Sequence, residues 1–472
     1  MTNISHIVSY EKVTEPYLTF SPERDDYINI HPLKGLVQYG PYNQKLIGNA
    51  FQTIRVATIG PIGTQKVIKE LINKLKSKQI PQERKSYLID FPGFEQVFKK
   101  NISINENINV EISKEEENAF LNSPKPYKKL SEILSQLITK ISSNKFDFDI
   151  LFIYLPAAWE IAFECKDDNE FDLHDYLKAI CVGYGIPTQI IREDKALLYP
   201  CQCSVMWHLG IAVYSKITGI PWKLAKMPLD TAYIGMSYAI RNQNEKSRFV
   251  TCCSQVFDAE GSGLEFVAYE TDNYKLGVND NPYLSKDEIR RVMTRCLSVY
   301  QERNAGKPPK NIVIHKSTEF KDDEINGCYD ALQVCENIEL VQIQQNSPWK
   351  GIKIEAKQKV AGYPCDRGTI LRLDNDLLVW TQGDIILARD GRHFYKEGRG
   401  IPAPILLKRY AGHGSLYESA YSILGLSKMN WNSDSLYDRL PVTLEFAKKL
   451  AQTIKRMPNL EACLLYTSPS PR

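Results

Sequence analysis

One apolar run constrains the fold of this chain more than any other feature of its sequence. Residues 146–156 read FDFDILFIYLP, which is nearly continuous in apolar side chains. A strand of this kind is covered on both faces, as in a parallel sheet between two layers of helices. A second apolar strand at 54–60 leads into a helix in which Val67, Leu71 and Leu75 recur every four residues. The first half of the chain is therefore predicted to be a doubly wound α/β unit. Further elements of this unit are expected as a helix from about 172, a strand at 186–191 and a helix at 204–217.

The second half of the chain changes to a different pattern. Three strand-like runs separated by turn residues predict an antiparallel meander, which a long helix then connects to another strand. These elements are expected at 232–240, 249–257, 264–270, 285–304 and 311–316. A helix near 321–335, several later strands and two closing helices complete the pattern. This is the order of an RNase H-like fold, although several other α+β folds share it.

The chain is predicted to divide into two units and a tail. Residues 1–228 form an N-terminal segment with the first α/β unit, and residues 229–462 form the second unit. The last ten residues, 463–472, resemble a translated sequencing adaptor and are expected to be non-native. Within the first unit, the Asn- and Glu-rich segment 101–118 is predicted to be a solvated hairpin or loop.

Composition excludes several classes of protein. The 59 Lys and Arg against 56 Asp and Glu give a formal charge of +3, so the chain is no general polyanion binder. The basic excess is local, because residues 350–460 hold 18 Lys or Arg and 11 Asp or Glu. No run approaches the roughly 18 to 20 apolar residues of a membrane span. The 11 cysteines contain no C-x-x-C pair and no secretory signal precedes them, so a cytoplasmic location is expected.

Four polar residues stand out between 172 and 217. His174 and Lys178 lie one turn apart on a predicted helix, and Gln189 lies on the strand that follows it. Lys216 falls on the apolar stripe of the next helix, where a lysine must snorkel, cap the helix or meet an anion. Together these residues would suit a terminal phosphate, with two cations for charge and an amide and imidazole for direction. On spacing alone, solvated His and Lys side chains and a snorkelling Lys216 are the favoured interpretation.

Other candidate motifs are weak. The segment GPIGTQK lacks the spacing of a phosphate-binding P-loop, and no G-x-G-x-x-G or G-x-S-x-G motif is present. His208, His393 and His413 lack partners at ligand spacing, so they are interpreted as structural or solvated histidines.

A series of motifs resembles the MID–PIWI core of prokaryotic Argonautes, and in particular the short forms. The resemblance covers most of the chain from about 146 to 460. The motifs, in order, are H-x-x-x-K from His174, GIPTQ, YSKITGIPWKL, YIGMSY, VIHKSTEF, CDRGT, LLVWTQG, GRGIPAPILL and KMNWNSDSLYDRLPVTLEFAKKLA. This resemblance implies a Rossmann-like MID domain followed by an RNase H-like PIWI domain. It also implies that His174, Lys178, Gln189 and Lys216 hold the 5′-phosphate of a guide, with a Mg²⁺ ion at that phosphate.

The chain departs from the family at the catalytic positions. Active members cut their target with a set of carboxylates that bind two Mg²⁺ ions, which prefer hard oxygen ligands. At the matching positions this chain has Ser237, Ser317 and Lys448. Two hydroxyls and an ammonium are not expected to hold two divalent ions. The resemblance therefore implies a chain without cleavage activity and without metal-ligating side chains.

The resemblance also implies partners. A short guide, expected to be RNA, would pair with single-stranded DNA from an invading plasmid or phage. Short Argonautes act with an effector that contains an APAZ region, here expected to be a sirtuin-like NADase, with a TIR NADase or a nuclease as alternatives. Target pairing would release the effector, deplete NAD and stop the infected cell, which is abortive infection.

Two other functions stay open at this stage. The same basic residues could belong to an α/β enzyme that binds a nucleotide or a phosphosugar. A PIWI-like nuclease could instead use carboxylates outside the family positions, such as Asp258, Asp366 and Asp384.

Overall fold

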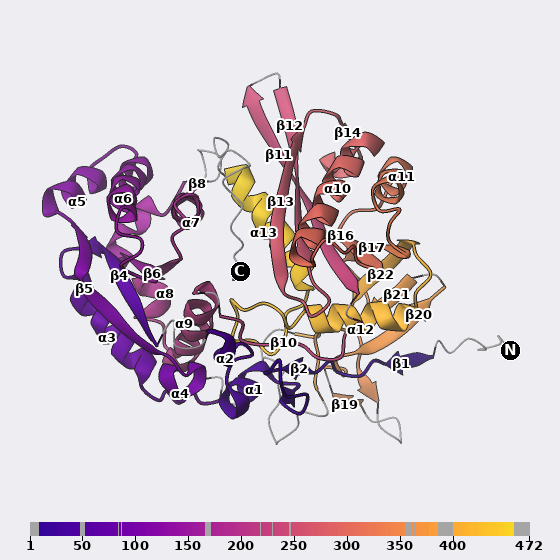
Figure 1. The fold of residues 1–472 in the computed structure, drawn as a ribbon, viewed down its shortest axis with the longest axis horizontal. Coiled ribbons are helices and arrows are strands. Elements are labelled where there is room, and N and C mark those ends of the chain that lie inside the picture. The colour runs from indigo at the N-terminus through magenta and orange to yellow at the C-terminus, as the bar shows by residue number, and fades with distance from the viewer. Residues whose placement is uncertain are drawn as a thin grey trace.

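The fold consists of two α/β units, seen in a computed structural model of the chain (Figure 1). The structure describes residues 9–456 except 48–51, 84, 86, 166–170, 218, 229, 245–246, 355–359, 363, 375 and 386–399. His393 and the tail at 463–472 lie outside the described residues. No described helix is long and apolar enough to cross a membrane.

The first unit is built on a four-stranded parallel sheet in the order β5-β4-β6-β9. Its strands are β4 (Thr53–Pro61), β5 (Asn101–Ile112), β6 (Ile150–Leu155) and β9 (Thr188–Arg192). Successive residues of β6 enter different clusters, with Phe152 in one core and Ile153 in the other. The apolar run is therefore covered on both faces, as predicted. Helices α3 (Thr64–Lys76), α4 (Phe94–Phe98) and α9 (Gln202–Lys216) pack on one face, and α6 (Pro126–Ser142) and α7 (Leu173–Gly183) on the other.

The prediction of a loop at 101–118 is wrong. These residues form β5 and the start of α5 (Lys114–Leu121). β5 is an edge strand whose residues are mostly half-exposed, so polar side chains are tolerated along it. The acidic run occupies the first turn of α5, where negative charge favours a helix. Ser113 and Glu116 form a capping box there, because each side chain accepts a hydrogen bond from the backbone N–H of the other.

The second unit is built on a nine-stranded sheet in the order β1-β20-β21-β22-β17-β16-β11-β12-β13. Its strands are β1 (Tyr10–Lys12), β11 (Thr231–Asn244), β12 (Ser247–Phe257), β13 (Gly263–Thr271), β16 (Asn311–Lys316), β17 (Asn337–Gln344), β20 (Thr369–Leu373), β21 (Asp376–Val379) and β22 (Ile405–Ala411). The meander β11-β12-β13 is antiparallel, whereas β11, β16 and β17 are parallel neighbours. The predicted RNase H-like order is confirmed.

Two helix pairs cover this larger sheet. Helices α10 (Lys286–Arg303) and α11 (Asp322–Ala331) pack on one face. Helices α12 (Leu416–Leu426) and α13 (Val442–Arg456) pack on the other, and α13 also reaches α7 of the first unit (Figure 1).

The N-terminal segment runs between the two units. It begins as β1, which pairs with β20 at one edge of the nine-stranded sheet, a pairing that the sequence does not predict. It continues through β2 (Leu18–Thr19) and β3 (Ile28–Asn29), which form a small sheet with β10 (Lys223–Leu224), and then through α1 (Pro32–Tyr39). Other short elements are α2 (Gln44–Ile47), β7 (Glu164–Cys165), β8 (Phe171–Asp172), α8 (Glu193–Ala196), β14 (Tyr274–Leu276), β15 (Pro282–Leu284), β18 (Lys353–Ile354) and β19 (Val360–Gly362).

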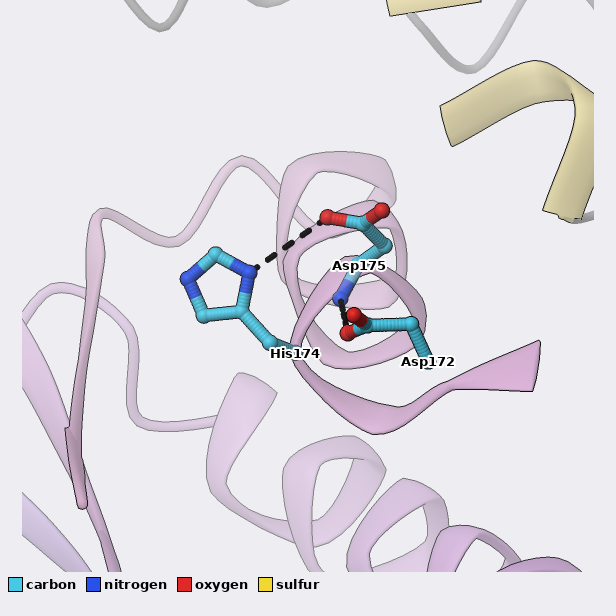
Figure 2. Close-up of side chains that lie close together, drawn as sticks. All are labelled: Asp172, His174 and Asp175. Carbon is cyan, nitrogen blue, oxygen red and sulfur yellow. Dashed lines mark hydrogen bonds and ion pairs between the residues drawn. The ribbon is translucent and has the colours of Figure 1, made fainter. Parts of the chain in front are cut away.

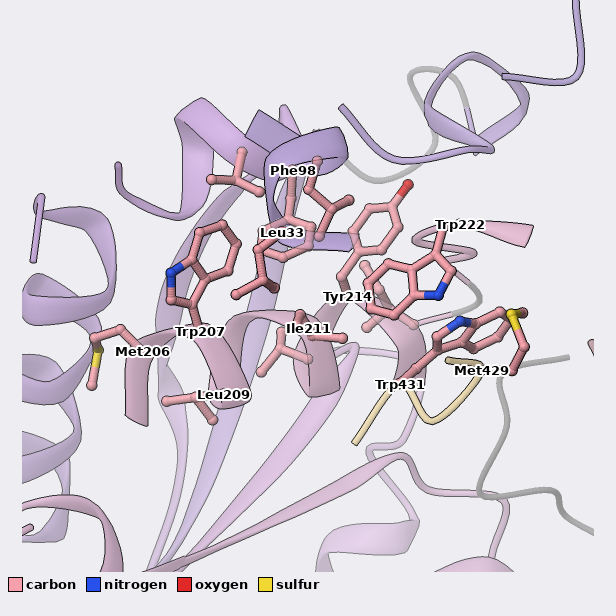
Figure 3. Close-up of a cluster of buried hydrophobic side chains, with 14 of the residues drawn as sticks. Leu33, Phe98, Met206, Trp207, Leu209, Ile211, Tyr214, Trp222, Met429 and Trp431 are labelled. Atoms are coloured by element: carbon pink, nitrogen blue, oxygen red, sulfur yellow. The ribbon is translucent and has the colours of Figure 1, made fainter. Parts of the chain in front are cut away.

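A shared hydrophobic cluster joins the two units. Figure 3 shows Trp207 and Tyr214 of α9 in the same cluster as Trp222, Met429 and Trp431, which come from the residue just before β10 and from the loop after α12. The indole N–H of Trp222 donates to the carbonyl of Lys428 at 3.0 Å. The large buried aromatic area fixes the loop after α12 against the first unit.

A buried ionic network holds the N-terminal segment in place. Arg367 Nε lies 3.1 Å from one carboxylate oxygen of Glu15, and Lys428 Nζ lies 2.5 Å from the other. All three residues are buried. Lys428 also donates to the carbonyls of Pro16 and Ile30. Burial alone would raise the pKa of Glu15, but Arg367 and Lys428 outweigh it, so the pKa lies below its ordinary value.

Glu15→Gln is expected to destabilise the protein by about 3 to 5 kcal/mol, because two buried cations lose their anion. Urea unfolding of this variant, of wild type and of Glu11→Gln on the exposed β1 would measure the change. The folded-state pKa of Glu15 is lowered. The loss of unfolding free energy in Glu15→Gln should therefore be complete above the unfolded-state pKa of Glu15 and should shrink as pH falls through its folded-state pKa. An equal effect of Glu11→Gln would contradict the role of the network.

Candidate functional site

Three elements of the first unit carry the four residues selected from the sequence. His174 and Lys178 lie one turn apart on α7, Gln189 is the second residue of β9, and Lys216 is the last residue of α9. Asp172 caps α7, since its carboxylate accepts the backbone N–H of Asp175 at 3.1 Å. The predicted positions on helix and strand are therefore those in the structure.

Lys216 and Gln189 are in direct contact. Lys216 Nζ donates to Gln189 Oε1 at 2.6 Å and to the carbonyl of Thr188 at 2.7 Å. Burial lowers the pKa of Lys216 well below its ordinary value, and the charge of Lys178 lowers it further. Both acceptors are neutral, and no described carboxylate pairs with Lys216. Lys216 is half-buried, and its protonated amine would have only these neutral acceptors, so an anion placed beside it would stabilise the charged form.

Gln189 has a different geometry from the one expected of a phosphate ligand. Its Nε2 group donates to the carbonyl of Ile190 at 3.1 Å, while its Oε1 accepts from Lys216. The side-chain amide of Gln189 therefore fixes the position of the Lys216 amine. One N–H of this amide is already used in the bond to Ile190.

His174 lies beside the carboxylate of Asp175 (Figure 2). The ring Nδ1 is 3.4 Å from Asp175 Oδ1, and 46% of the side chain is exposed. The surrounding protein removes water from the ring and lowers the pKa of His174, an effect that Asp175 partly offsets. Lys178 is exposed, and its pKa is also lowered, first by loss of hydration and then by the like charge of Lys449. The cations at this site therefore repel one another in the free protein.

A cavity of about 780 Å³ opens beside these residues. His174 and Gln189 line it from the first unit, whereas Lys178 and Lys216 are not among its lining residues. The opposite wall comes from the loop after α12 and from α13, and it includes Asn430, Asp438 and Lys449. The cavity thus lies between the two units.

Sequence reasoning missed several basic residues of this cavity, among them His208 and Lys449. His208 lies two turns before Lys216 on α9, and both His208 and Lys449 line the cavity. Loss of hydration lowers the pKa of His208, and the positive charges of Lys216 and Lys449 lower this pKa further. The negative charge of Asp434 partly offsets these effects. The spacing of eight residues places His208 on the same side of α9 as Lys216, and this signal was available in the sequence.

The wall contributed by the second unit is acidic. Asn430 Nδ2 donates to Asp438 at 2.8 Å and to Glu445 at 3.3 Å, and Glu445 pairs with Lys449 at 2.7 Å. Burial and the neighbouring Glu445 raise the pKa of Asp438 to about 6. Because carboxylates repel a phosphate, the charge distribution restricts an anion to the side formed by α7 and α9.

The carboxylates nearest His174 do not form a free metal site. Asp172, His174 and Asp175 place one ligand atom each within 4.8 Å of the others, the one such group among the described residues. The guanidinium of Arg456 on α13 already pairs with Asp172 at 3.2 Å and with Asp175 at 2.8 Å. A divalent ion bound by these side chains would have to displace this cation. The described residues therefore do not fit a side-chain Mg²⁺ site here.

The three positions that the family resemblance matches to catalytic residues lie on β11, directly after β16 and on α13. Met236 of β11 pairs with Lys316 of β16 in parallel register, so Ser237 and Ser317 are the next residues along neighbouring strands. Lys448 lies on α13, which packs across this part of the sheet.

The three carboxylates of the alternative nuclease hypothesis, Asp258, Asp366 and Asp384, do not form one cluster. Asp258 follows β12 and lies 3.6 Å from Lys223, whereas Asp366 precedes β20 on the other side of the sheet. Asp366 pairs with Lys12 at 2.7 Å and also with Lys353. Asp384 is a bridge partner of Asp366 and lies 3.8 Å from the same Lys353. These aspartates are therefore neutralised by lysines in two separate ion-pair clusters.

Asp175→Asn is expected to lower the pKa of His174 further, because His174 loses the negative charge and the hydrogen bond with which Asp175 raises that pKa. Asp434→Asn should do the same to His208 and leave His174 unchanged. Histidine side-chain NMR titrations of wild type and the two variants would measure both values. A shift of His174 in Asp434→Asn, or none in Asp175→Asn, would contradict the described pairing.

Comparisons with known proteins complete the description of the fold. No protein-family model matches the sequence, and no curated protein matches it. Solved structures of Argonautes match it in three dimensions. The Argonaute of Clostridium butyricum, solved with a guide DNA and a 19-mer target DNA, has a TM-score of 0.68 and 16% identity over 99% of this chain and 56% of its own. Aa-Ago with externally bound siRNA has a TM-score of 0.58 and 17% identity over 95% of this chain and 54% of its own.

A third match is the Argonaute of Aquifex aeolicus, with a TM-score of 0.57 and 16% identity over 94% of this chain and 54% of its own. The chain therefore spans about half the length of the Argonautes that it matches. At this level of identity the likeness shows the fold. The chain has the mixed α/β fold of the MID–PIWI part of Argonaute proteins, in which a Rossmann-like unit precedes an RNase H-like unit.

Proposed function

We propose that this chain binds a short nucleic-acid guide by its 5′-phosphate and pairs the guide with a complementary target strand. The observation that carries the proposal is Lys216, a half-buried lysine whose amine donates to neutral acceptors, one of which, Gln189, lines a cavity together with His174. A doubly charged terminal phosphate would supply the counter-charge that the described residues do not.

The cavity has room for more than a phosphate. Its volume of about 780 Å³ lies within the range of pockets that hold whole small ligands. The terminal nucleotide of a strand could occupy it, with the phosphate on the side of α7 and α9 and the remainder of the strand leaving between the units. The Clostridium butyricum Argonaute, which has this fold, was solved with a guide DNA and a target DNA.

Binding along the second unit would depend on local charge. Residues 350–460 carry 18 Lys or Arg against 11 Asp or Glu, although the whole chain has a formal charge of only +3. A locally positive surface would hold the strand backbones, while base pairing would supply the sequence specificity. A Mg²⁺ ion could accompany the guide phosphates, but it would be bound without a side-chain ligand from this chain.

The chain is proposed to bind the target without cutting it. Support comes from the residue types at the degenerate catalytic positions, since Ser237, Ser317 and Lys448 offer two hydroxyls and an ammonium. A two-metal mechanism needs carboxylate oxygens that bridge or flank two divalent ions.

The biological role is proposed from the family resemblance. The guide would be RNA and the target single-stranded DNA of an invader, and the chain would be the recognition subunit of a cytoplasmic defence system. Its partner would be an APAZ-containing effector, first a sirtuin-like NADase and otherwise a TIR NADase or a nuclease. A conformation favoured by the paired target would activate that partner.

Lys178→Ala and Lys216→Ala are each expected to reduce the preference for a 5′-phosphorylated over a 5′-hydroxyl guide by about ten- to a hundredfold, as for a charged hydrogen bond. Fluorescence anisotropy with both guides would measure the ratio of affinities. Lys128→Ala, which removes an exposed lysine on α6, is the charge-matched control. Wild-type ratios in both site variants would refute the phosphate assignment.

Purified chain with guide, labelled complementary target and Mg²⁺ or Mn²⁺ is expected to leave the target intact on a denaturing gel. With the APAZ partner added, NAD should fall when the target matches the guide and stay constant with a mismatched target. Guide-directed cleavage by the chain alone would overturn the non-cleaving role, and NAD loss without a matched target would overturn the coupling.

A further inference from the structure

Two carboxylates lie close together on the cavity wall that the second unit contributes. Asp438 and Glu445 both line the cavity, and both accept from one amide nitrogen, Nδ2 of Asn430, at 2.8 Å and 3.3 Å. Asn430 is buried, and the backbone N–H of Asp438 donates to the carbonyl of Ser427 at 2.7 Å, so the fold holds the pair in place. Two carboxylates that share a donor repel one another when both are ionised.

The charges around this pair do not balance. Glu445 has one cation, Lys449, at 2.7 Å, and the same lysine is the cation that acts on Asp438. Asp434, the third carboxylate of the cavity lining, has partners on α9 instead, because Ser204 donates to it at 2.5 Å and its charge acts on His208. Asp438, Glu445 and Lys449 therefore carry one net negative charge, which a single proton would neutralise.

The free protein is close to taking up this proton. Burial and the charge of Glu445 raise the pKa of Asp438 to about 6, although Asn430 and Lys449 favour the ionised form. At neutral pH Asp438 is therefore mostly ionised in the free protein. A modest increase in the negative potential of the cavity is sufficient to protonate it.

A guide strand would supply that potential. Under the proposed function, the terminal phosphate lies toward α7 and α9, and the strand leaves between the units past the wall that includes Asp438. A negative charge within about 8 Å, one Debye length at physiological salt, is only partly screened. At the effective dielectric constant of a partly exposed site, such a charge strengthens proton binding by a carboxyl group about tenfold or more. The bound state therefore favours a protonated Asp438.

We propose that guide binding is coupled to the uptake of one proton by the pair of Asp438 and Glu445. This inference rests on the proposed function and concerns the regulation of the same cavity. The proton removes one negative charge beside the phosphates, and the neutral carboxyl group of Asp438 can donate a hydrogen bond to Glu445. Guide affinity is then greatest in mildly acidic solution and falls as the pH rises through the neutral range.

The first experiment measures the affinity of the full chain for a 5′-phosphorylated guide as a function of pH. Fluorescence anisotropy is recorded in EDTA, so that no divalent ion replaces the proton. Wild type is expected to lose up to tenfold in affinity per pH unit above about 6, the pKa of the carboxyl group in the free protein. Asp438→Asn, which resembles the protonated acid in shape and charge, should bind about tenfold or more tightly than wild type near pH 8.

The design separates Asp438 from the other groups that titrate. His174, His208 and the terminal phosphate change charge in wild type and in Asp438→Asn alike, so the difference between the two curves reports the carboxyl group of Asp438. Asp272→Asn removes an exposed aspartate between β13 and β14 and is the charge-matched control. Its affinity curve should have the same slope as that of wild type.

Calorimetry counts the proton directly. Titrations of guide into protein near pH 7, in buffers with different ionisation enthalpies, give the number of protons taken up on binding. Wild type and Asp272→Asn should take up more than Asp438→Asn, by up to one proton. Urea unfolding near pH 8 checks the fold, and Asp438→Asn should unfold at the same or a higher urea concentration than wild type because it lacks a half-buried charge.

The outcomes distinguish this inference from the function on which it rests. Equal pH curves and equal proton numbers for wild type and Asp438→Asn would overturn the proton coupling and leave guide binding in place. A wild-type chain that binds no guide at any pH would overturn the proposed function, and the coupling with it.

Discussion

The close approach of α13 to β11 is the constraint on which the candidate site depends. Because Gly235 has no Cβ, the backbone of Thr443 can lie against the strand, and a larger residue would push the helix away. Thr443 Oγ1 also bonds the buried His315 at 2.9 Å. With α13 held there, Lys448 lies half-buried on this helix. One residue further along, Lys449 lines the cavity between the units. The packing of this helix therefore positions part of the cavity wall.

The opposite end of α13 connects to the N-terminus of α7. Arg456 pairs with Asp172 and Asp175, which respectively cap α7 and contact His174. Arg456 thus neutralises two carboxylates that would otherwise repel a phosphate at His174. The acidic residues on the other wall, which include Asp438, remain. The cavity is consequently polarised, and a near-neutral net charge for the chain is compatible with a local cluster of basic residues on one wall.

Much of the fold follows from the sequence, because hydrophobic periodicity reports burial directly. The continuous apolar run along β6 and the meander from β11 to β13 are examples. The segment 101–118 was misread because an edge strand and a helix first turn both tolerate polar residues. The pairing of β1 with β20 joins residues about 360 positions apart, and three exposed residues give no periodic signal for it. His208 and Lys449 become cavity residues only when the two units meet, which no local pattern encodes.

The lysines of this chain show why burial alone could not identify the site. Lys316 and Lys428 are buried as deeply as any residue, but each pairs with a glutamate, Glu324 and Glu15 respectively. Their charges are compensated within the fold, so their role is structural. Lys216 has no described carboxylate partner. In the sequence all such lysines look alike, since a partner about 8 or 400 residues away leaves no sign in the local spacing. What separates a structural lysine from a ligand-binding one is therefore the missing anion, and the tertiary structure is needed to see it.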